Sequence, residues 1–125
     1  MPRHILDEAR LHPAIRARVS ALHREVVDDA LSAVARHAVV VLGMAGNPFV
    51  RRARRALDAA GVPHHDIDHG SYFSGWRQRN ALKLWTGWPT LPMVFVKGSL
   101  VGGAEDVQRL IDSGELQRLL KAQPD

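Results

Sequence analysis

Residues 46–52, GNPFVRR, follow an apolar run, AVVVLGM, and open a basic segment, RRARRALDAAG. This order predicts a strand followed by a helix, and the N-terminal end of a helix favours anionic groups. Asn47 lies at the expected N-cap, directly before Pro48. Asparagine is a preferred capping residue, and capping of this helix is the favoured interpretation of Asn47.

The chemistry at this helix start is limited because none of the 125 residues is a cysteine. Disulfides, cysteine nucleophiles and thiolate metal ligands are therefore excluded. Thiol–disulfide exchange needs a thiolate that attacks a disulfide, and Asn47 cannot supply one. No catalytic residue is predicted, and the sequence leans against enzymatic activity without deciding the question.

A second polar segment, HHDIDH at residues 64–69, combines residue types that bind metals. In a strand, His64, Asp66 and Asp68 share one face, while His65 and His69 share the other. Neither face offers a convincing tetrahedral set, and no cysteine supports one. We therefore predict no metal site and expect solvated histidines at the end of a strand.

The net charge of +4 comes mostly from arginine, notably RRARR at residues 51–55. Such a basic helix could meet nucleic acid or acidic partners. No aromatic residue alternates with these arginines to stack on bases. A solvated helix face is favoured, with Ala53, Ala56, Leu57 and Ala60 turned inward, and no nucleic-acid partner is expected.

The composition is that of an ordinary globular protein, with 46% hydrophobic and 24% charged residues. The length predicts one domain. No apolar run approaches the roughly 20 residues of a membrane span. The first ten residues, MPRHILDEAR, lack the apolar core of a signal peptide. A soluble, cytoplasmic protein without membrane contact is expected.

Apolar spacing and glycine or proline positions predict the elements that must hold these residues. The expected helices and strands are helix 13–37, strand 38–42, helix 48–60, strand 62–68, helix 76–85, strand 93–96, strand 100–101 and helix 104–120. The KGSL turn joins the last two strands as a hairpin, and Gly114 divides the last helix. This order predicts a mixed sheet with helices on both faces.

Three parts of this plan leave alternatives open. Residues 13–37 form one helix or two, and the stripe Ile15, Val19, Leu22 and Val26 packs on the domain or on a second subunit. The aromatic residues Tyr72, Phe73 and Trp76 are expected to anchor the third helix on the core, or else to edge a pocket. Trp85 and Trp88 are expected to be packing residues.

The motifs GWPT with LP, then VKG, then VGG, resemble those of the glutaredoxin family, most closely its monothiol branch. The resemblance covers about residues 30–120. It implies a thioredoxin-like α/β fold with a four-stranded mixed sheet flanked by helices. Residues 1–29 would then be an N-terminal helical extension and residues 30–121 the glutaredoxin-like domain. The resemblance also implies that Pro92 follows a cis peptide bond.

The resemblance further implies a glutathione groove and places Asn47 at the family's catalytic cysteine position. The residues that it assigns to glutathione binding are Asn47, Phe49, Arg79, Thr90, Leu91, Pro92, Gly103, Ala104 and Glu105. In the family, the residue before the cis-proline pairs its backbone with glutathione, and the arginine meets the glycine carboxylate. Here these residues are Leu91 and Arg79, and Lys83 also matches a family lysine.

The chain departs from the family pattern at three places. Met44 replaces a lysine that normally precedes the active-site motif, and Ala104 and Glu105 replace a cysteine–aspartate or serine–aspartate pair. The third departure is Asn47 itself. Asparagine is a poor ligand for the [2Fe–2S] cluster that the monothiol branch holds, because such clusters are bound by thiolates or occasionally histidine.

Three functions are carried forward. The first is a redox-inactive binding protein that uses the groove for glutathione, a peptide end or another small thiol. The second is a glutathione-dependent enzyme of transferase type, in which the Asn47 amide donates a hydrogen bond to the glutathione thiolate, or else a redox or iron–sulfur relative of the family. The third is an interaction protein with a vestigial pocket, which forms a homodimer through the N-terminal helix. Glutathione is the one candidate cofactor, and no metal is assigned.

Overall fold

The computed structural model describes residues 3–71 and 73–121. A short 3₁₀ turn at Glu8–Arg10 precedes the regular elements. The helices and strands are, in chain order, α1 (Pro13–Ala21), α2 (Arg24–Arg36), β1 (Val39–Gly43), α3 (Pro48–Ala59), β2 (His65–Asp68), α4 (Trp76–Thr86), β3 (Met93–Val96), β4 (Ser99–Gly102), α5 (Ala104–Asp112) and α6 (Glu115–Lys121).

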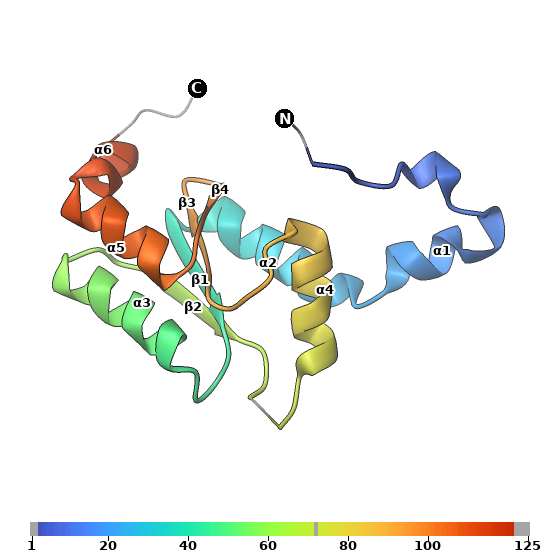
Figure 1. Ribbon diagram of the computed structural model, residues 1–125, viewed down its shortest axis with the longest axis horizontal. Helices are drawn as coiled ribbons and strands as arrows, with labels where there is room; N and C mark the ends of the chain where they lie inside the picture. Colours follow the sequence, from blue (N-terminus) through green and yellow to red (C-terminus); the bar gives the residue numbers. More distant parts are fainter. Residues whose placement is uncertain (1–2, 72, 122–125) are drawn as a thin grey trace.

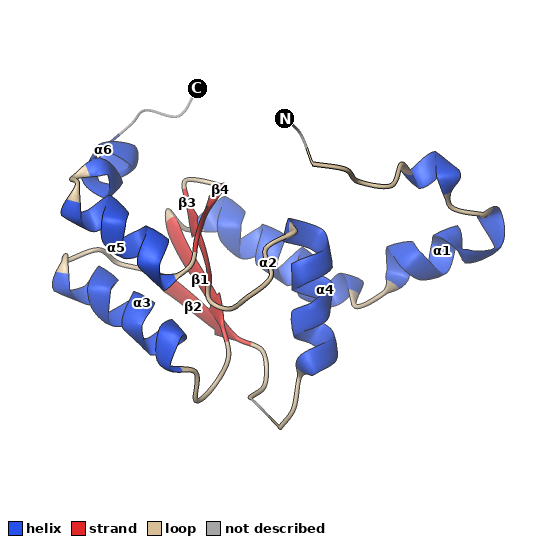
Figure 2. Ribbon diagram, viewed as in Figure 1, coloured by secondary structure: helices blue, strands red, loops and turns tan. Residues whose placement is uncertain are grey.

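The four strands form one mixed sheet, as the sequence predicts, and their order in it is β2–β1–β3–β4 (Figure 2). β1 and β2 are parallel, whereas β3 is antiparallel to both β1 and β4. The β3–β4 hairpin turns at Lys97 and Gly98, whose φ angles are 51° and 86°. Positive φ at both central residues is typical of the turn that matches the twist of a two-residue hairpin.

β1 lies in the middle of the sheet, and its alternating side chains divide the core into two clusters. Val40 and Leu42 belong to the cluster that α2 and α4 cover. Val39 and Val41 belong to the cluster under α3, α5 and α6. All five residues of β1 are buried, as expected for a central strand with helices on both sides. Figure 1 shows these helices on opposite sides of the sheet.

Residues 13–37 form two helices, which resolves that alternative. The break lies at Leu22 and His23, and His23 has a φ of 45°, which is rare for a residue with a side chain. The predicted apolar stripe is buried only from Val26 onward, while Val19 and Leu22 are 50% and 55% exposed. α1 projects from the body (Figure 1), and the predicted domain boundary at residues 29 and 30 falls inside α2.

Two other predictions need correction. β2 begins at His65 rather than at residue 62, because Val62 bonds back to Leu57 and Pro63 has no amide hydrogen to donate. The expected aromatic anchor is wrong for Phe73, which is 98% exposed, and Trp76 is also exposed. Tyr72 lies outside the described residues. The loop before α4 is held instead by Arg79, whose Nη1 donates to the carbonyl oxygens of His69 and Ser74.

Candidate functional site

The start of α3 is capped by Asn47, as predicted. Its Oδ1 accepts hydrogen bonds from the backbone amides of Phe49 at 2.8 Å and Val50 at 3.1 Å. Two of the orphan donors at the helix start are thereby satisfied. The side chain is almost fully buried, and within the described residues its Nδ2 has no acceptor. Asn47 therefore caps the helix through Oδ1, and its Nδ2 remains available as a hydrogen-bond donor.

A groove of about 270 Å³ opens beside this helix start. It lies where the start of α3, the loop before β3 and the start of α5 come together (Figure 1). The residues that line it are Phe49, Trp88, Thr90, Leu91, Pro92, Gly103, Ala104, Glu105 and Asp106. The structure thus brings together seven of the nine predicted site residues, all except Asn47 and Arg79.

The loop wall of the groove is fixed by hydrogen bonds at the end of α4. Thr86 Oγ1 donates to the carbonyl of Leu82 at 2.9 Å and accepts from the Trp88 amide at 3.1 Å. The Leu91–Pro92 peptide bond is cis, as the resemblance implies. Within the described residues, the backbone N–H and C=O of Leu91 make no hydrogen bond. An extended ligand could therefore pair with Leu91 as a strand pairs with a sheet edge.

The opposite wall is the start of α5. Gly103 N–H donates to Asp106 Oδ2 at 2.9 Å, which caps the helix. Gly102 has a φ of 118°, and a Cβ there would meet Asp106 Oδ2 at 2.5 Å, so the close approach requires glycine. Asp106 is occupied by this cap, while the amides of Ala104 and Glu105 lie in the first turn. Such amides are donors for a ligand carboxylate.

Trp88 and Asp106 belong to the groove although the sequence alone did not assign them to it. Trp88 packs partly against the core, as predicted, but it also lines the groove. Its Nε1 is buried and has no hydrogen-bond partner within the described part of the chain. The sequence feature that could have placed Trp88 in the groove is the Trp–Pro pair beside the LP motif. For Asp106, that signal was an acidic residue three positions after a glycine at a helix start.

Arg79 lies elsewhere, under the loop that precedes α4. It is 8% exposed, and Nη1 donates to His69 O at 2.9 Å and Ser74 O at 2.6 Å. Met44, which replaces the family lysine, is buried in the core. The residues lining the groove therefore include no lysine or arginine, and its charged side chains are those of Glu105 and Asp106.

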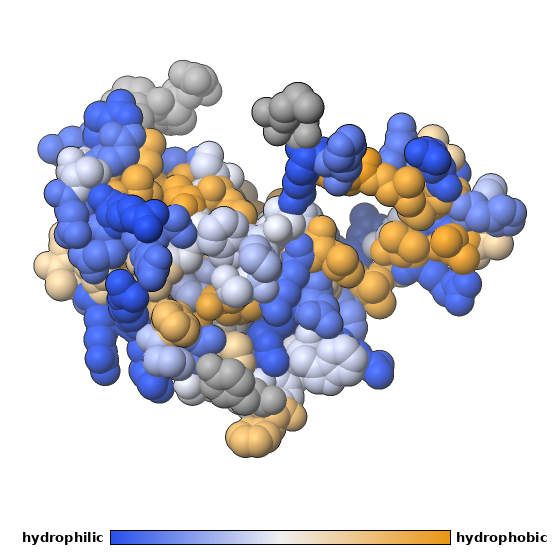
Figure 3. Space-filling model, in the orientation of Figure 1, coloured by the Kyte–Doolittle hydropathy of each residue, from blue (hydrophilic) through white to orange (hydrophobic). Residues whose placement is uncertain are grey.

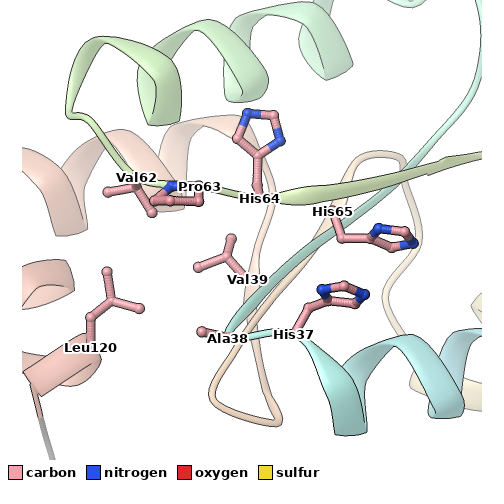
Figure 4. A pocket seen from close by; sticks show the side chains of 8 residues that line it. All are labelled: His37, Ala38, Val39, Val62, Pro63, His64, His65 and Leu120. Atoms are coloured by element: carbon pink, nitrogen blue, oxygen red, sulfur yellow. The ribbon is translucent and has the colours of Figure 1, made fainter.

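A second cavity of about 290 Å³ lies at the opposite end of β1 (Figure 4). His37 and His65 stack along one side, with ring centroids 4.1 Å apart and planes within 3° of parallel. The His64 ring lies on the other side of β2 (Figure 4). Its Nε2 is 2.7 Å from Asp58 Oδ1, and its Nδ1 is 2.6 Å from Asp66 Oδ1.

The two contacts of His64 require a proton on both ring nitrogens, because both partners are carboxylates. Burial by itself lowers the pKa of His64, but the hydrogen bonds to Asp58 and Asp66 outweigh it and raise the pKa above 6.5. The predicted shared face of His64 and Asp66 is confirmed, but the expected solvation is wrong for His64, whose side chain is 9% exposed and contacts two carboxylates. Across residues 3–71 and 73–121, no group of three or more His, Asp or Glu side chains is placed to hold a metal ion.

No described helix is both long enough and apolar enough to cross a bilayer. The Glutaredoxin family profile matches residues 39–101. A glutaredoxin-like protein of Dictyostelium discoideum is 39% identical over 103 residues, which are 82% of this chain and 84% of that protein. Glutaredoxin-3 of Bos taurus is 32% identical over 78% of this chain, but the match spans only 30% of its own length.

Solved glutaredoxin structures share the fold. A buckwheat glutaredoxin–glutathione complex superposes with a TM-score of 0.71 and 25% identity, covering 80% of this chain and 91% of that one. A wheat glutaredoxin gives a TM-score of 0.67 and 30% identity, covering 78% and 90% of the two chains. The family profile spans α3 and β3 and ends at residue 101, before the start of α5.

Proposed function

Because this chain belongs to the glutaredoxin family, we propose that it binds glutathione or a similar small thiol peptide without thiol–disulfide exchange. The observation that carries this proposal is a groove whose Leu91 backbone groups are unpaired within the described residues, in a chain without cysteine. A ligand thiol in this groove meets no protein thiolate. Binding is therefore separated from the exchange reaction.

Two features of the groove support a peptide-like ligand with a carboxylate. The Leu91 backbone offers one donor and one acceptor to an extended chain. The first-turn amides of α5 face a position where an anionic group is stabilised by the helix end. The buckwheat relative is a complex with glutathione, a tripeptide that meets both requirements.

The nine predicted residues have different parts in this proposal. Phe49, Thr90, Leu91, Pro92, Gly103, Ala104 and Glu105 contact the ligand directly from the groove walls. Asn47 stabilises the start of α3 and offers Nδ2. A ligand contact of Arg79 stays a prediction, since its Nη1 is engaged by two carbonyl oxygens. Without a cation in the lining, we expect affinity in the millimolar range.

Titration of the isotope-labelled protein with reduced glutathione tests the proposal. We expect saturable amide shifts at Leu91 and Gly103–Glu105, and none at His37 or His65, which line the other cavity. Oxidised glutathione serves as a second ligand. The Thr90→Trp variant, whose larger side chain fills the groove, is the control in which the shifts should be lost. An absence of saturable shifts, or shifts centred on the histidine cavity, would contradict glutathione binding in the groove.

A transferase-type enzyme is the second candidate, and the free Nδ2 of Asn47 favours it. In this mechanism Nδ2 would donate to the thiolate of bound glutathione at the helix start. Asn47→Asp keeps the capping oxygen but removes the donor, whereas Asn47→Ala removes both. If the wild type conjugates glutathione to a chromogenic electrophile and both variants lose this activity, the result supports a transferase-type enzyme. Turnover retained in Asn47→Asp, or absent from the wild type, rejects it.

A homodimer through α1 is the third candidate, and it rests on an uncovered apolar surface. No residue of α1 is buried, and Figure 3 shows orange apolar residues among blue hydrophilic ones on the projecting arm. Val19 and Leu22 share a hollow of about 360 Å³ with Val27, Leu84 and Trp85. We infer that a second copy covers it, because a two-fold axis can place each arm on the partner's hollow.

The charged residues that line the hollow are Arg24 and Asp28 of α2, which lie 3.7 Å apart, so the contact surface offered to a second copy is mainly apolar. Light scattering at several concentrations should give a dimer for the full chain and a monomer after deletion of residues 1–22. Val19→Glu should act like the deletion, and Leu31→Glu, an exposed site outside the hollow, should not. A monomeric full chain contradicts this assignment.

The cytoplasmic location expected from the sequence is part of the proposal, because reduced glutathione is abundant in reducing compartments. Cell fractionation with an antibody against the chain tests it, and recovery in the membrane or secreted fraction contradicts it.

A further inference from the structure

Three arginines on the outer side of α3 surround a hollow that the groove does not include. Its volume is about 410 Å³. The residues that line it are Pro48, Arg51, Arg52, Arg55, Ala56 and, from α5, Gln108. Pro48 is the neighbour of Phe49 in the chain, yet the two line different concavities. The start of α3 therefore separates a groove without lysine or arginine from a cationic surface.

The three guanidinium groups have no carboxylate partner within residues 3–71 and 73–121. Other arginines in the same chain do find partners. Arg54, on the same helix, lies 2.7 Å from Asp68 and 3.4 Å from Asp66. The absence of partners at the hollow is therefore a local property, and it does not follow from a shortage of carboxylates near α3.

The nearest acidic residues of α5 are engaged in other contacts. Asp106 accepts from the Gly103 amide, and Glu105 lies 3.8 Å from Arg109. Asp112 accepts from Gln108 Nε2 at 2.9 Å, which holds the Gln108 side chain against its own helix. Among the described residues, no carboxylate of α5 is therefore left to pair with the arginines of the hollow.

The arginine cluster lowers the stability of α3 for two reasons. Arg51 and Arg55 are four positions apart, so that their like charges repel across one helical turn. The first turn of α3 also contains no acidic residue to balance the helix dipole. A bound anion would relieve both effects at once, which makes the cluster better suited to a ligand than to stability.

We propose that Arg51, Arg52 and Arg55 bind the pyrophosphate group of a small molecule. Guanidinium groups form paired hydrogen bonds with phosphate oxygens, and three of them match a group with about three negative charges at neutral pH. No aromatic side chain lines the hollow, so a stacking platform for single-stranded nucleic acid is missing. This proposal goes beyond the glutathione groove and does not depend on it.

Titration with inorganic pyrophosphate, followed by amide shifts and calorimetry at about 50 mM salt, tests the site. We expect one saturable site, with shifts at residues 48–56 and Gln108 and none at Leu91. The double variant Arg51→Gln with Arg55→Gln should weaken binding by about tenfold or more. Arg18→Gln with Arg36→Gln changes the net charge equally at exposed arginines elsewhere and should alter affinity by less than about threefold.

Further ligands distinguish the source of the group. Equal affinities for pyrophosphate and ADP indicate that the phosphates alone are bound, and tighter ADP binding indicates a nucleotide; both support the site. Equal weakening in the two double variants would mean non-specific charge attraction and overturn it. Failure to saturate also overturns it, as does displacement of pyrophosphate by a single-stranded oligonucleotide at lower concentration, which would assign the surface to nucleic acid.

Discussion

The two ends of α3 border cavities of nearly equal size, about 270 Å³ at its start and 290 Å³ beyond its end. They differ in what their polar groups do. At the far end, His64 is hydrogen bonded to both Asp58 and Asp66, and the rings of His37 and His65 cover each other. At the start, the Leu91 backbone and Trp88 Nε1 have no partner within the described residues.

This difference teaches that volume alone does not locate a binding site. A buried polar group without a partner is costly, and a ligand can supply that partner. A group already paired gains little from a ligand that must displace its partner. This contrast supports the proposal of ligand binding at the start of α3, whereas the contacts of His64 join α3 to β2 at the other end. The predictions below test this division of roles.

The largest effect is expected when a thiol is placed at the groove end. Asn47→Cys should reduce a glutathione mixed disulfide about a hundredfold faster than the wild type, because a helix start stabilises a thiolate. That thiolate attacks the glutathione sulfur and releases the other thiol. Reduced glutathione then regenerates the protein thiol and leaves as oxidised glutathione. A coupled reductase assay measures the rate.

His65→Cys is the matched control, since it places a thiol beside the other cavity, away from a helix start. It should remain as inactive as the wild type. Equal activity of the two variants, or an inactive but folded Asn47→Cys protein, would falsify the idea that only the groove end retains a frame for glutathione.

A core substitution near the histidine end should separate stability from binding. Leu57 is fully buried between α3 and the sheet. Leu57→Ala should lower the free energy of unfolding by about 3 kcal/mol, through lost burial and the cavity it leaves. Urea denaturation measures the loss. Glutathione affinity of the folded variant should stay unchanged, and a parallel loss of affinity would show that the two ends are coupled.

The cap at Asn47 should matter less for stability. Asn47→Ala removes the acceptor for the Phe49 and Val50 amides and should cost about 1 kcal/mol of unfolding free energy. Asn47→Asp retains the acceptor and should be at least as stable as the wild type, because a carboxylate also suits the helix dipole. Equal destabilisation by the two substitutions would argue against the capping role.

The smallest effect is a pH dependence at the histidine end. The pKa of His64 is raised in the folded protein, so its contribution to stability is fully present below its unfolded pKa of 6.5. The contribution is lost as pH rises through the folded pKa. Comparison of the wild type with His64→Gln by urea denaturation should show a difference of about 1 kcal/mol that disappears in alkaline solution.

His65→Gln, on the exposed face of the same strand, is the control and should show no such trend. A wild-type advantage over His64→Gln that stays constant or grows with pH would mean that His64 is not held as the cation.

The sequence was sufficient for the sheet and most helices because those elements have strong local signals. The β-branched run of β1, Pro48 with Gly61 around α3, and the Lys97–Gly98 turn each specify a conformation by themselves. The start of β2 was misplaced because Val62 pairs with Leu57, a contact that local pattern does not contain. The exposure of the apolar stripe of α1 was likewise not predictable from local pattern, because it depends on how far this helix lies from the rest of the protein.

Leu91, Pro92 and Gly103, which the resemblance assigns to a glutathione groove, do line a groove in the structure, while their contact with a ligand stays a prediction. The assignment was incomplete where side chains decide, because Trp88 can pack and line the groove at once. Arg79 is the opposite case, because the resemblance assigns it to the groove and the structure places it elsewhere. Its type and position match the family, but two backbone carbonyls of a neighbouring loop hold its guanidinium group. Such partners come from residues that only the folded chain brings together.

The central claim is that the groove, and not the histidine cavity, binds glutathione. Isothermal calorimetry of reduced glutathione against two matched variants tests it most directly, because Thr90→Trp fills one concavity and His65→Trp the other. We predict that Thr90→Trp weakens binding by about tenfold or more, while His65→Trp leaves it within about twofold of the wild type. The reverse order, or equal effects of the two substitutions, would contradict the account.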